Sequence, residues 1–351
     1  MNAPIPFQSA TCPLPLRDYP QIVMGHGGGG KLSAELIEHV FLPAFGLSDQ
    51  VLSDSTVLDL PGHRIAVSTD SFVVRPLFFP GGSIGDLAVN GTVNDLAMSG
   101  AIPKYLTAGF ILEEGLEIET LVRIAADMAR AARDAGVCIV AGDTKVVERG
   151  RGDGCYINTT GIGLLPSGRD ISIGQACSGD AVLISGTIAD HAMAIMSVRD
   201  GLEFEAPIRS DTVSVSSMVQ GLMKDCPNVR CLRDPTRGGL ATTMNEIAAA
   251  SCCGIELVES DIPVDPVVRS ACEFLGLDPM LAANEGKFVA IVPGEDAERA
   301  LASIRSHPFG RAAAIIGRVV EDPHHLVVAK TLFGSNRVVP MPIGEQLPRI
   351  C

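Results

Sequence analysis

Residues 83–99 read SIGDLAVNGTVNDLAMS, and the prediction of the fold starts from this stretch. The spacing predicts a helix on which Asp86, Asn90 and Asn94 recur every four residues and so share one face. Asp95 lies next to this polar stripe. A face of carboxylates and carboxamides is unusual for a core helix, so we expect this helix to carry cation or nucleotide ligands.

The stretches on either side of this helix predict strands and helices in alternation. Two β-rich runs precede it, VLSDSTVLDL and HRIAVSTDSFVV, and they place Asp54 and Asp70 beside small hydroxyl residues. Asp is unfavourable inside a strand, so each carboxylate is either a ligand or the closure of a turn. Downstream, residues 119–135 predict a helix that Gly136 ends. The strands VCIVAGDTKVV and INTTGIGLL follow, with GRGDG (150–154) predicted as a hairpin turn between them.

The strand VCIVAGDTKVV supplies a second set of polar groups. Gly142, Asp143, Thr144 and Lys145 offer a backbone amide, a carboxylate, a hydroxyl and an ammonium in four consecutive positions. Such a set can surround one phosphate together with its metal ion. We therefore expect a phosphate site near this strand.

A second α/β layer is predicted from residue 174 onward, with a helix expected over 210–224. Asp234 lies in RDPTRGGL, at a helix N-terminus that is rich in hydrogen-bond donors. This cap is either a ligand site or purely structural. Glu285 lies in NEGK, directly before the predicted strand FVAIVP, and so places a charge at a strand edge.

The glycine-rich stretch GHGGGGK at 25–31 stands between a short predicted strand and an amphipathic helix. A strand, a glycine loop and a helix N-terminus together can form a phosphate cradle. The loop fits G-x-x-x-x-G-K, but Leu32 stands where a Walker loop needs Ser or Thr. This difference favours a glycine flap that closes over a ligand. His26 is then either a ligand contact or a turn residue.

The end of the chain is rich in proline and stops on a thiol. Pro340, Pro342 and Pro348 exclude a regular helix or a central strand, so an extended arm with Cys351 at its tip is expected. At roughly 5–6 Å × √n for a flexible chain, the thiol samples about 20 Å from Pro340. The alternative is a frayed terminus whose last residue is a cysteine.

Composition limits the class of protein. A length of 351 residues favours two domains, and a net charge of −14 argues against nucleic-acid binding. The apolar runs are too short for a membrane span and no signal layout precedes them, so we expect a cytoplasmic protein without membrane contact. Ten cysteines without a CxxC pair argue against a disulfide scaffold or a structural zinc site. The predicted division is a disordered leader (1–20), a glycine-rich loop and helix (21–48), a first domain (49–166), a second domain (174–330) and a flexible tail (331–351).

GHGGGGK, STDS, GTVNDLAMSGA, AGDTKVV, DPTRGGLA, NEGK and the terminal PRIC occur in one order along the chain. Together they resemble the HypE family of hydrogenase maturation factors. The chain also resembles the wider PurM-like family, which includes aminoimidazole ribonucleotide synthetase and selenophosphate synthetase. The resemblance implies an α+β fold in which a first domain with a mixed β-sheet forms a homodimer and an α/β second domain follows. ATP and a divalent metal, Mg²⁺, would bind between domains and subunits.

The resemblance also implies the site residues. The implied metal ligands are Asp54, Asp70, Asp95 and Asp234. The implied nucleotide contacts are these four together with Asn94, Asp143, Thr144 and Lys145. The implied catalytic residues are Cys351, Glu285 and Lys145. Glu285 is the candidate base, and the alternative is an ion pair of Glu285 with Lys145 or Lys287.

The activity implied by the resemblance is an ATP-dependent dehydration. A carbamoyl group, loaded onto Cys351 by the carbamoyltransferase HypF, would become a thiocyanate. Its cyano group would pass to the iron on the HypC–HypD scaffold for a nickel–iron hydrogenase. One alternative is a passive thiol carrier for which ATP only switches the shape. Selenophosphate synthesis would need a reactive Cys or selenocysteine in the glycine loop, and purine synthesis leaves PRIC unexplained.

Overall fold

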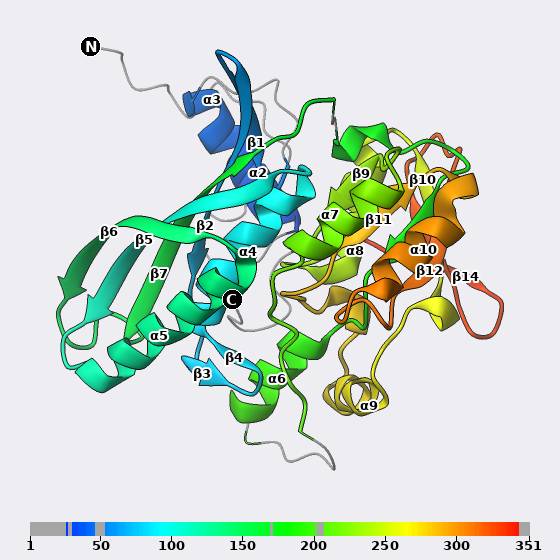
Figure 1. Ribbon diagram of the computed structural model, residues 1–351. Helices are drawn as coiled ribbons and strands as arrows, with labels where there is room; N and C mark the ends of the chain where they lie inside the picture. Colours follow the sequence, from blue (N-terminus) through cyan, green and yellow to red (C-terminus); the bar gives the residue numbers. More distant parts are fainter. Residues whose placement is uncertain are drawn as a thin grey trace.

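The computed structural model describes residue 26 and residues 30–45, 53–168, 171–199, 201 and 207–343. The chain forms two domains that lie side by side, each built on one β-sheet (Figure 1). The α+β architecture agrees with the prediction. No helix among these residues is long and apolar enough to cross a membrane. The predicted leader and the last residues, 344–351 with the terminal cysteine, lie outside the described ranges.

The first domain is a five-stranded sheet with helices on one face. The strand order is β1-β2-β7-β5-β6. Helices α4 and α5 pack against each other, and α4 also lies across β2 and β7. A two-stranded ribbon of β3 and β4 precedes α4. The bounds are β1 Thr56–Leu60, β2 His63–Phe72, β3 Phe78–Phe79, β4 Gly82–Ser83, α4 Ile84–Met98, β5 Ile102–Glu113, α5 Ile118–Ala135, β6 Cys138–Val147 and β7 Cys155–Leu164.

The predicted hairpin at 150–154 is wrong. Strand β6 pairs in parallel with β5 at the edge of the sheet, whereas β7 lies antiparallel between β5 and β2. Residues 150–154 therefore cross from the edge strand over to the centre. The carboxylate of Glu113 holds this crossing, because it accepts hydrogen bonds from the backbone N–H groups of Gly150 and Gly154.

Helix α4 is a buried core helix instead of the exposed helix that its polar stripe predicted, although the predicted ligand Asp95 does lie on it. Ser83 caps it in a capping box with Asp86, and Asp86 also binds Arg130 of α5 at 2.8 Å. Asn90 and Asn94 are buried as well and bond to residues of the second domain. Asn90 and Asn94 therefore join the two domains, while Asp86 links α4 to α5 within the first domain.

The second domain is a seven-stranded mixed sheet in the order β14-β13-β10-β12-β8-β11-β9. Helices α7 and α10 pack on one face of this sheet and α8 on the other. Helices α6 and α9 instead share a core with α4 and α5 of the first domain. The bounds are β8 Ala181–Ile184, α6 Asp190–Arg199, α7 Ser216–Asp225, β9 Cys231–Arg233, α8 Gly239–Ala250, β10 Gly254–Val258, α9 Pro266–Leu275, β11 Val289–Val292, α10 Ala297–Ser306, β12 Ala314–Val320, β13 Val327–Lys330 and β14 Asn336–Val338.

Two predicted boundaries differ from the structure. The helix expected over 210–224 begins only at Ser216, because residues 210–215 form no regular secondary structure and are bonded to the first domain. The tail expected from residue 331 still contains β14, which pairs with β13. Farther on, the carbonyl of Pro342 accepts a hydrogen bond from the N–H of Lys31, at the start of helix α2 (Lys31–Leu36). The C-terminal segment is thus part of the fold up to residue 343.

Candidate functional site

Three of the predicted metal ligands meet where the two domains touch. Asp54 precedes β1, Asp95 lies on α4, and Asp234 directly follows β9. A carboxylate oxygen from each lies within 4.8 Å of the others. Carboxylates gathered this closely are the ligands that Mg²⁺ and Ca²⁺ prefer. We refer to Asp54, Asp95 and Asp234 as the acidic cluster.

The electrostatics of the acidic cluster favour a bound cation. Burial raises the pKa of Asp54 and Asp95 well above the usual range, and it raises the pKa of Asp234 to about 6. The neighbouring carboxylates raise the pKa of Asp95 further. The Oδ2 atom of Asp54 is buried and accepts no hydrogen bond from the part of the chain that the structure describes. Such an atom in a set of oxygen ligands fits a divalent cation.

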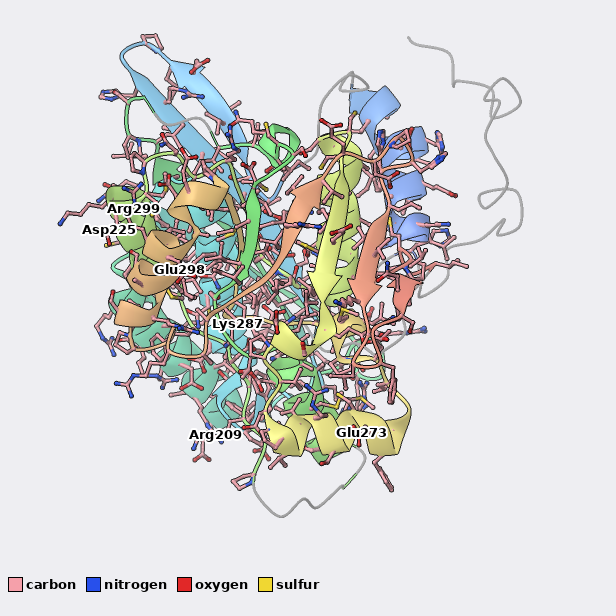
Figure 2. All side chains as sticks on the ribbon, turned by 90° about the vertical axis from the view of Figure 1, so that its right-hand side faces the viewer. Arg209, Asp225, Glu273, Lys287, Glu298 and Arg299 are labelled. Carbon is pink, nitrogen blue, oxygen red and sulfur yellow. The ribbon has the colours of Figure 1, made fainter. Side chains whose placement is uncertain are left out.

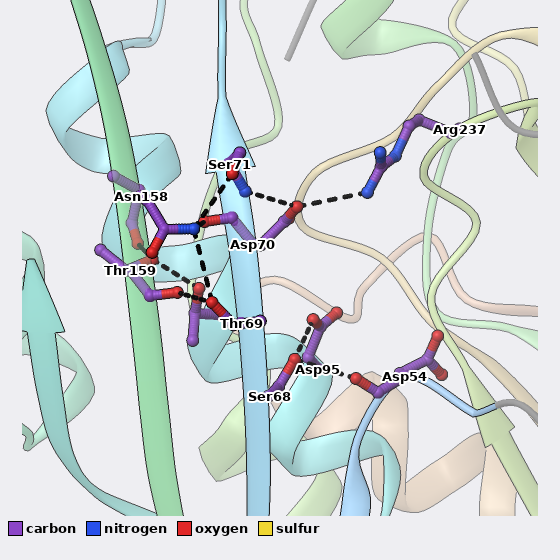
Figure 3. Close-up of polar contacts among 11 residues, drawn as sticks. Asp54, Ser68, Thr69, Asp70, Ser71, Asp95, Asn158, Thr159 and Arg237 are labelled. Carbon is purple, nitrogen blue, oxygen red and sulfur yellow. Dashed lines mark hydrogen bonds and ion pairs between the residues drawn. The ribbon is translucent and has the colours of Figure 1, made fainter. Parts of the chain in front are cut away.

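Two neighbours fix the carboxylates of the acidic cluster. Arg233 binds Asp54 Oδ1 through Nη1 at 2.6 Å and also pairs with Glu246. The Ser68 hydroxyl lies 2.6 Å from Asp95 Oδ2 and 2.9 Å from the Asp54 carbonyl oxygen, as Figure 3 shows. Sequence reasoning missed both residues, although Arg233 directly precedes Asp234 in the motif RDPTRGGL.

Asp70 lies beside the acidic cluster and is bound to an arginine. Its Oδ1 atom accepts hydrogen bonds from Arg237 Nη2 at 3.2 Å and from the Ser71 N–H at 2.9 Å (Figure 3). Its negative charge raises the pKa of both Asp95 and Asp234. The structure therefore places Asp70 next to the three carboxylates but outside the group whose oxygens lie within 4.8 Å.

Glu285 is the buried carboxylic acid of the site, with 4% of its surface exposed. Burial raises its pKa well above the usual range, and the charges of Asp70 and Asp234 add to this shift. The two expected lysine partners are engaged elsewhere, since Lys145 pairs with Asp143 and Lys287 with Asp211. An acid with a raised pKa in such a place is a candidate for proton transfer.

Asn94 is 1% exposed, and its side-chain amide forms hydrogen bonds with backbone groups. Its Nδ2 donates to the carbonyl oxygens of Val213 at 3.0 Å and Glu285 at 3.1 Å, and its Oδ1 accepts from the Val215 N–H at 2.8 Å. These three bonds use both donors and one acceptor site. Asn94 therefore holds the main chain of Glu285, and the predicted nucleotide contact of Asn94 stays a prediction.

The residues predicted to bind phosphate near Lys145 lie on the opposite face of the first sheet. Asp143 and Lys145, each with 71% of its side chain exposed, pair in register with Gly109 and Ile111 on the solvent-facing side. Ser68 reaches Asp95 from the side that α4 covers. A single chain therefore does not bring Lys145 to the acidic cluster. Thr144 lies between Asp143 and Lys145 on the same strand, with its side chain alternating to the other face.

Only part of the glycine loop is described. His26 is buried, and Gly30 adopts a left-handed φ of +85°. A Cβ atom on Gly30 would lie 2.4 Å from the carbonyl oxygen of Pro342. Glycine is thus required where the loop meets the base of the C-terminal arm. Gly27–Gly29 and Cys351 lie outside the described residues, so the predicted flap and the catalytic thiol stay predictions.

Comparison with known proteins identifies relatives along nearly the whole chain. Residues 52–165 match the N-terminal domain of AIR synthase related proteins, and residues 178–330 match their C-terminal domain. A protein of Azotobacter vinelandii named carbamoyl dehydratase HypE is 54% identical over 333 residues, which cover 94% of this chain and 97% of that protein.

Two solved structures are similar in sequence and in fold. A structure described as a HypE–HypF complex contains a chain that is 50% identical, with a TM-score of 0.82, over 88% of this chain and 99% of that one. A structure of hydrogenase maturation protein HypE in complex with ATP is 48% identical, with a TM-score of 0.80, over 94% of this chain and 100% of that one.

Proposed function

The chain belongs to the HypE family of carbamoyl dehydratases, and on this premise we propose that it uses ATP to dehydrate an S-carbamoyl group on Cys351 to a thiocyanate. The product supplies a cyanide ligand to iron during the maturation of nickel–iron hydrogenase. The observation that carries the proposal is the buried acid Glu285 beside a cluster of carboxylates that fits a divalent cation. This combination suits phosphoryl transfer followed by proton removal.

The reaction must make an amide oxygen into a leaving group. The carbamoyl oxygen attacks the γ-phosphorus of ATP, a new P–O bond forms, and ADP leaves. The two N–H protons are then removed, the C–O bond breaks, and the oxygen departs within phosphate. The balance is one thiocarbamate and ATP giving one thiocyanate, ADP, phosphate and a proton. Glu285 is the base in this scheme, because its raised pKa suits it to take a proton near neutral pH.

In this proposal the charge of the phosphates would be neutralised by Lys145 and by a Mg²⁺ ion that the acidic cluster would hold. Asp54, Asp95 and Asp234 would hold the metal ion, with Asp70 joining them when Arg237 moves to another partner. When bound, Mg²⁺ would compensate the negative charge of the polyphosphate. Lys145 would balance the charge that develops during transfer, and Asp143, which shares its sheet face, would orient the phosphates, whereas the Thr144 side chain lies on the other face.

We extend the proposal to a homodimer, because Lys145 faces away from the acidic cluster of its own chain. The same solvent-facing side of the first sheet carries a row of exposed apolar side chains. These are Leu58, Leu60, Tyr105, Ile111, Ile162 and Leu164. A second copy packed on this face would cover them and would enclose Lys145 within an intersubunit site.

The partners follow from the chemistry of the arm. We propose that HypF loads the carbamoyl group and that a HypC–HypD complex accepts the cyano group, both in the cytoplasm where ATP is available. A HypE–HypF complex has been solved for a relative that is 50% identical, which supports the first partner. A thiol carried at the end of an arm can visit a donor, a closed site and an acceptor in turn.

Phosphate release tests this function. The carbamoylated chain is mixed with MgATP, and phosphate and thiocyanate are measured together, with Cys351→Ala as the control. The proposal expects one phosphate for each thiocyanate in a single turnover and none above background in the variant. ATP binding without phosphate release from the loaded chain would favour the alternative, a passive thiol carrier.

A further inference from the structure

Residues 210–215 form a segment without regular secondary structure between the two domains, which we call the interdomain strap. The Ser210 N–H donates to the carbonyl of Pro80 at 2.8 Å, and Thr212 Oγ1 lies 3.4 Å from Asn90 Nδ2. Asn94 binds the backbone at two further points of the strap. The strap is thus anchored to the first domain along its length, beside the helix that carries Asp95.

One side chain of the interdomain strap, Asp211, points the other way into the second domain. It is 3% exposed, and its Oδ1 accepts a hydrogen bond from the Glu285 N–H at 3.1 Å. Its Oδ2 lies 3.3 Å from Lys287 Nζ. A Cβ atom on Gly286 would lie 1.9 Å from the Asp211 carbonyl oxygen, so the two backbones are in direct contact. Asp211 therefore touches the residues on both sides of Gly286.

The main chain of Glu285 is held at both of its polar groups. Asp211 binds its N–H, and Asn94 binds its carbonyl oxygen. Both anchors start from elements that are fixed to the first domain, which also supplies Asp95 of the acidic cluster. The position of the Glu285 carboxylate relative to the acidic cluster thus depends on these two contacts.

Lys287 explains why the charge of Asp211 matters. The lysine lies within the body of the molecule (Figure 2), and its side chain is 10% exposed. Its Cε packs so closely on Gly186 that a Cβ atom there would lie 2.8 Å away. A buried ammonium needs a negative partner. Asp211 supplies it, and Glu285 stands only two residues from the same lysine.

We propose that Asp211 is a positioning residue for the dehydration, because it fixes the main chain of Glu285 and keeps the ammonium of Lys287 away from the Glu285 carboxylate. This inference rests on the proposed function and on Glu285 as its base. With Lys287 held by Asp211, Glu285 keeps its carboxylate available for a proton from the substrate.

The substitution Asp211→Asn separates the two tasks. An Asn oxygen can still accept from the Glu285 N–H, but it offers no charge to Lys287. Without that charge the ammonium needs another carboxylate, and Glu285, two residues away, competes for it with Asp190, whose pKa the charge of Lys287 already lowers. Pairing with Glu285 should slow thiocyanate formation at saturating MgATP at least about tenfold, a fraction of what a general base contributes. Carbamoyl loading and the KM for ATP should stay unchanged. The double variant Asp211→Asn with Lys287→Met removes the ammonium and should recover most of the wild-type rate.

The possible outcomes decide the proposal. Rescue of the rate by Lys287→Met supports it, because a purely structural defect would not be repaired by a second core substitution. A wild-type rate in Asp211→Asn overturns it, and so does a folded double variant that remains as slow as the single one. If Asp211→Asn does not fold, the double variant is compared directly with the wild type. A rate near that of the wild type supports the proposal, and a folded but slow double variant overturns it. Absence of thiocyanate from the wild-type chain would instead reject the proposed function itself.

Discussion

Replacing Asp95 by Asn tests the acidic cluster, because it removes one charge while nearly keeping the shape. The Asp95 carboxylate lies within 4.8 Å of oxygens of Asp54 and Asp234, and Ser68 holds it at 2.6 Å. An Asn oxygen at this position can still accept the hydrogen bond from Ser68. The substitution therefore acts chiefly through electrostatics.

The magnitude follows from the distance. Two ionised carboxylates 4.8 Å apart repel each other by about 3.5 kcal/mol at an effective dielectric constant of ~20, and Asp95 takes part in two such pairs. The repulsion cannot cost more than protonating Asp95. Protonation costs about 1.4 kcal/mol for each pH unit above the ordinary pKa of Asp, and so about 5 kcal/mol at pH 7.5. Arg233 beside Asp54 offsets part of it. We expect Asp95→Asn to stabilise the metal-free protein by about 2 to 4 kcal/mol at pH 7.5.

The pH dependence has a definite sign. The folded-state pKa values of Asp95 and Asp234 are raised, that of Asp234 to about 6, so the folded chain binds protons that the unfolded chain releases. The stability from these groups is present below the ordinary pKa of about 4 and is lost as the pH rises through the raised values. The advantage of Asp95→Asn over the wild type should therefore shrink from pH 7.5 to pH 5.

Thermal unfolding in EDTA and in MgCl₂ with ATP measures both effects. We expect Asp95→Asn to raise the Tm in EDTA at pH 7.5 and to reduce the further rise that MgATP produces, because one ligand is lost. Asp59→Asn, at an exposed site that pairs with Arg64, is the control and should change neither value much. A variant that is less stable than the wild type in EDTA at both pH values would refute the reasoning.

The remaining predictions address catalysis, the dimer and the arm. Lys145→Ala and Glu285→Ala should keep carbamoyl loading but lose thiocyanate formation, for Glu285→Ala by about 10²-fold or more in mass spectrometry of the loaded chain. Ile162→Asp should produce a folded monomer in analytical ultracentrifugation, because it places a charge on the apolar sheet face. Gly30→Ala should lower stability by about 1–3 kcal/mol more than Gly168→Ala in thermal unfolding, since both have a left-handed φ but only the first meets another residue.

Each of these has a clear contrary result. Unchanged dehydration in both active-site variants would remove these residues from the mechanism. A dimer that survives Ile162→Asp would place the interface elsewhere. Equal losses for the two glycine variants would show that the contact of Gly30 with Pro342 does not hold the base of the arm.

The helices with local signals were predictable from the sequence. The helix expected over 83–99 is α4, and Gly136, with φ +70°, ends α5 as the sequence predicted. The aspartates of the acidic cluster were likewise found, because Asp54 stands beside small hydroxyl residues, Asp95 beside the polar stripe of its helix and Asp234 at a donor-rich helix N-terminus. Their meeting at one point depends on the fold, and it came from a family resemblance rather than from spacing.

Features that depend on distant contacts were not predictable in this way. Asn90 and Asn94 of the α4 stripe join the domains because partners 119 and more residues away bind them, and periodicity alone cannot show that. The strap at 210–215 stays outside helix α7 for the same reason. The face on which Lys145 lies depends on strand register, and Asp211 carries no motif that marks it. In each case the deciding interaction is tertiary.

The central claim is that this chain itself removes water from the group carried on Cys351. The most direct measurement is intact-protein mass spectrometry of the carbamoylated chain before and after addition of MgATP, with Cys351→Ala treated in the same way. The account predicts that the loaded wild-type chain loses the mass of one water molecule and that the variant is never loaded. A carbamoyl mass that persists while ATP is bound would contradict the account and assign the dehydration to another protein.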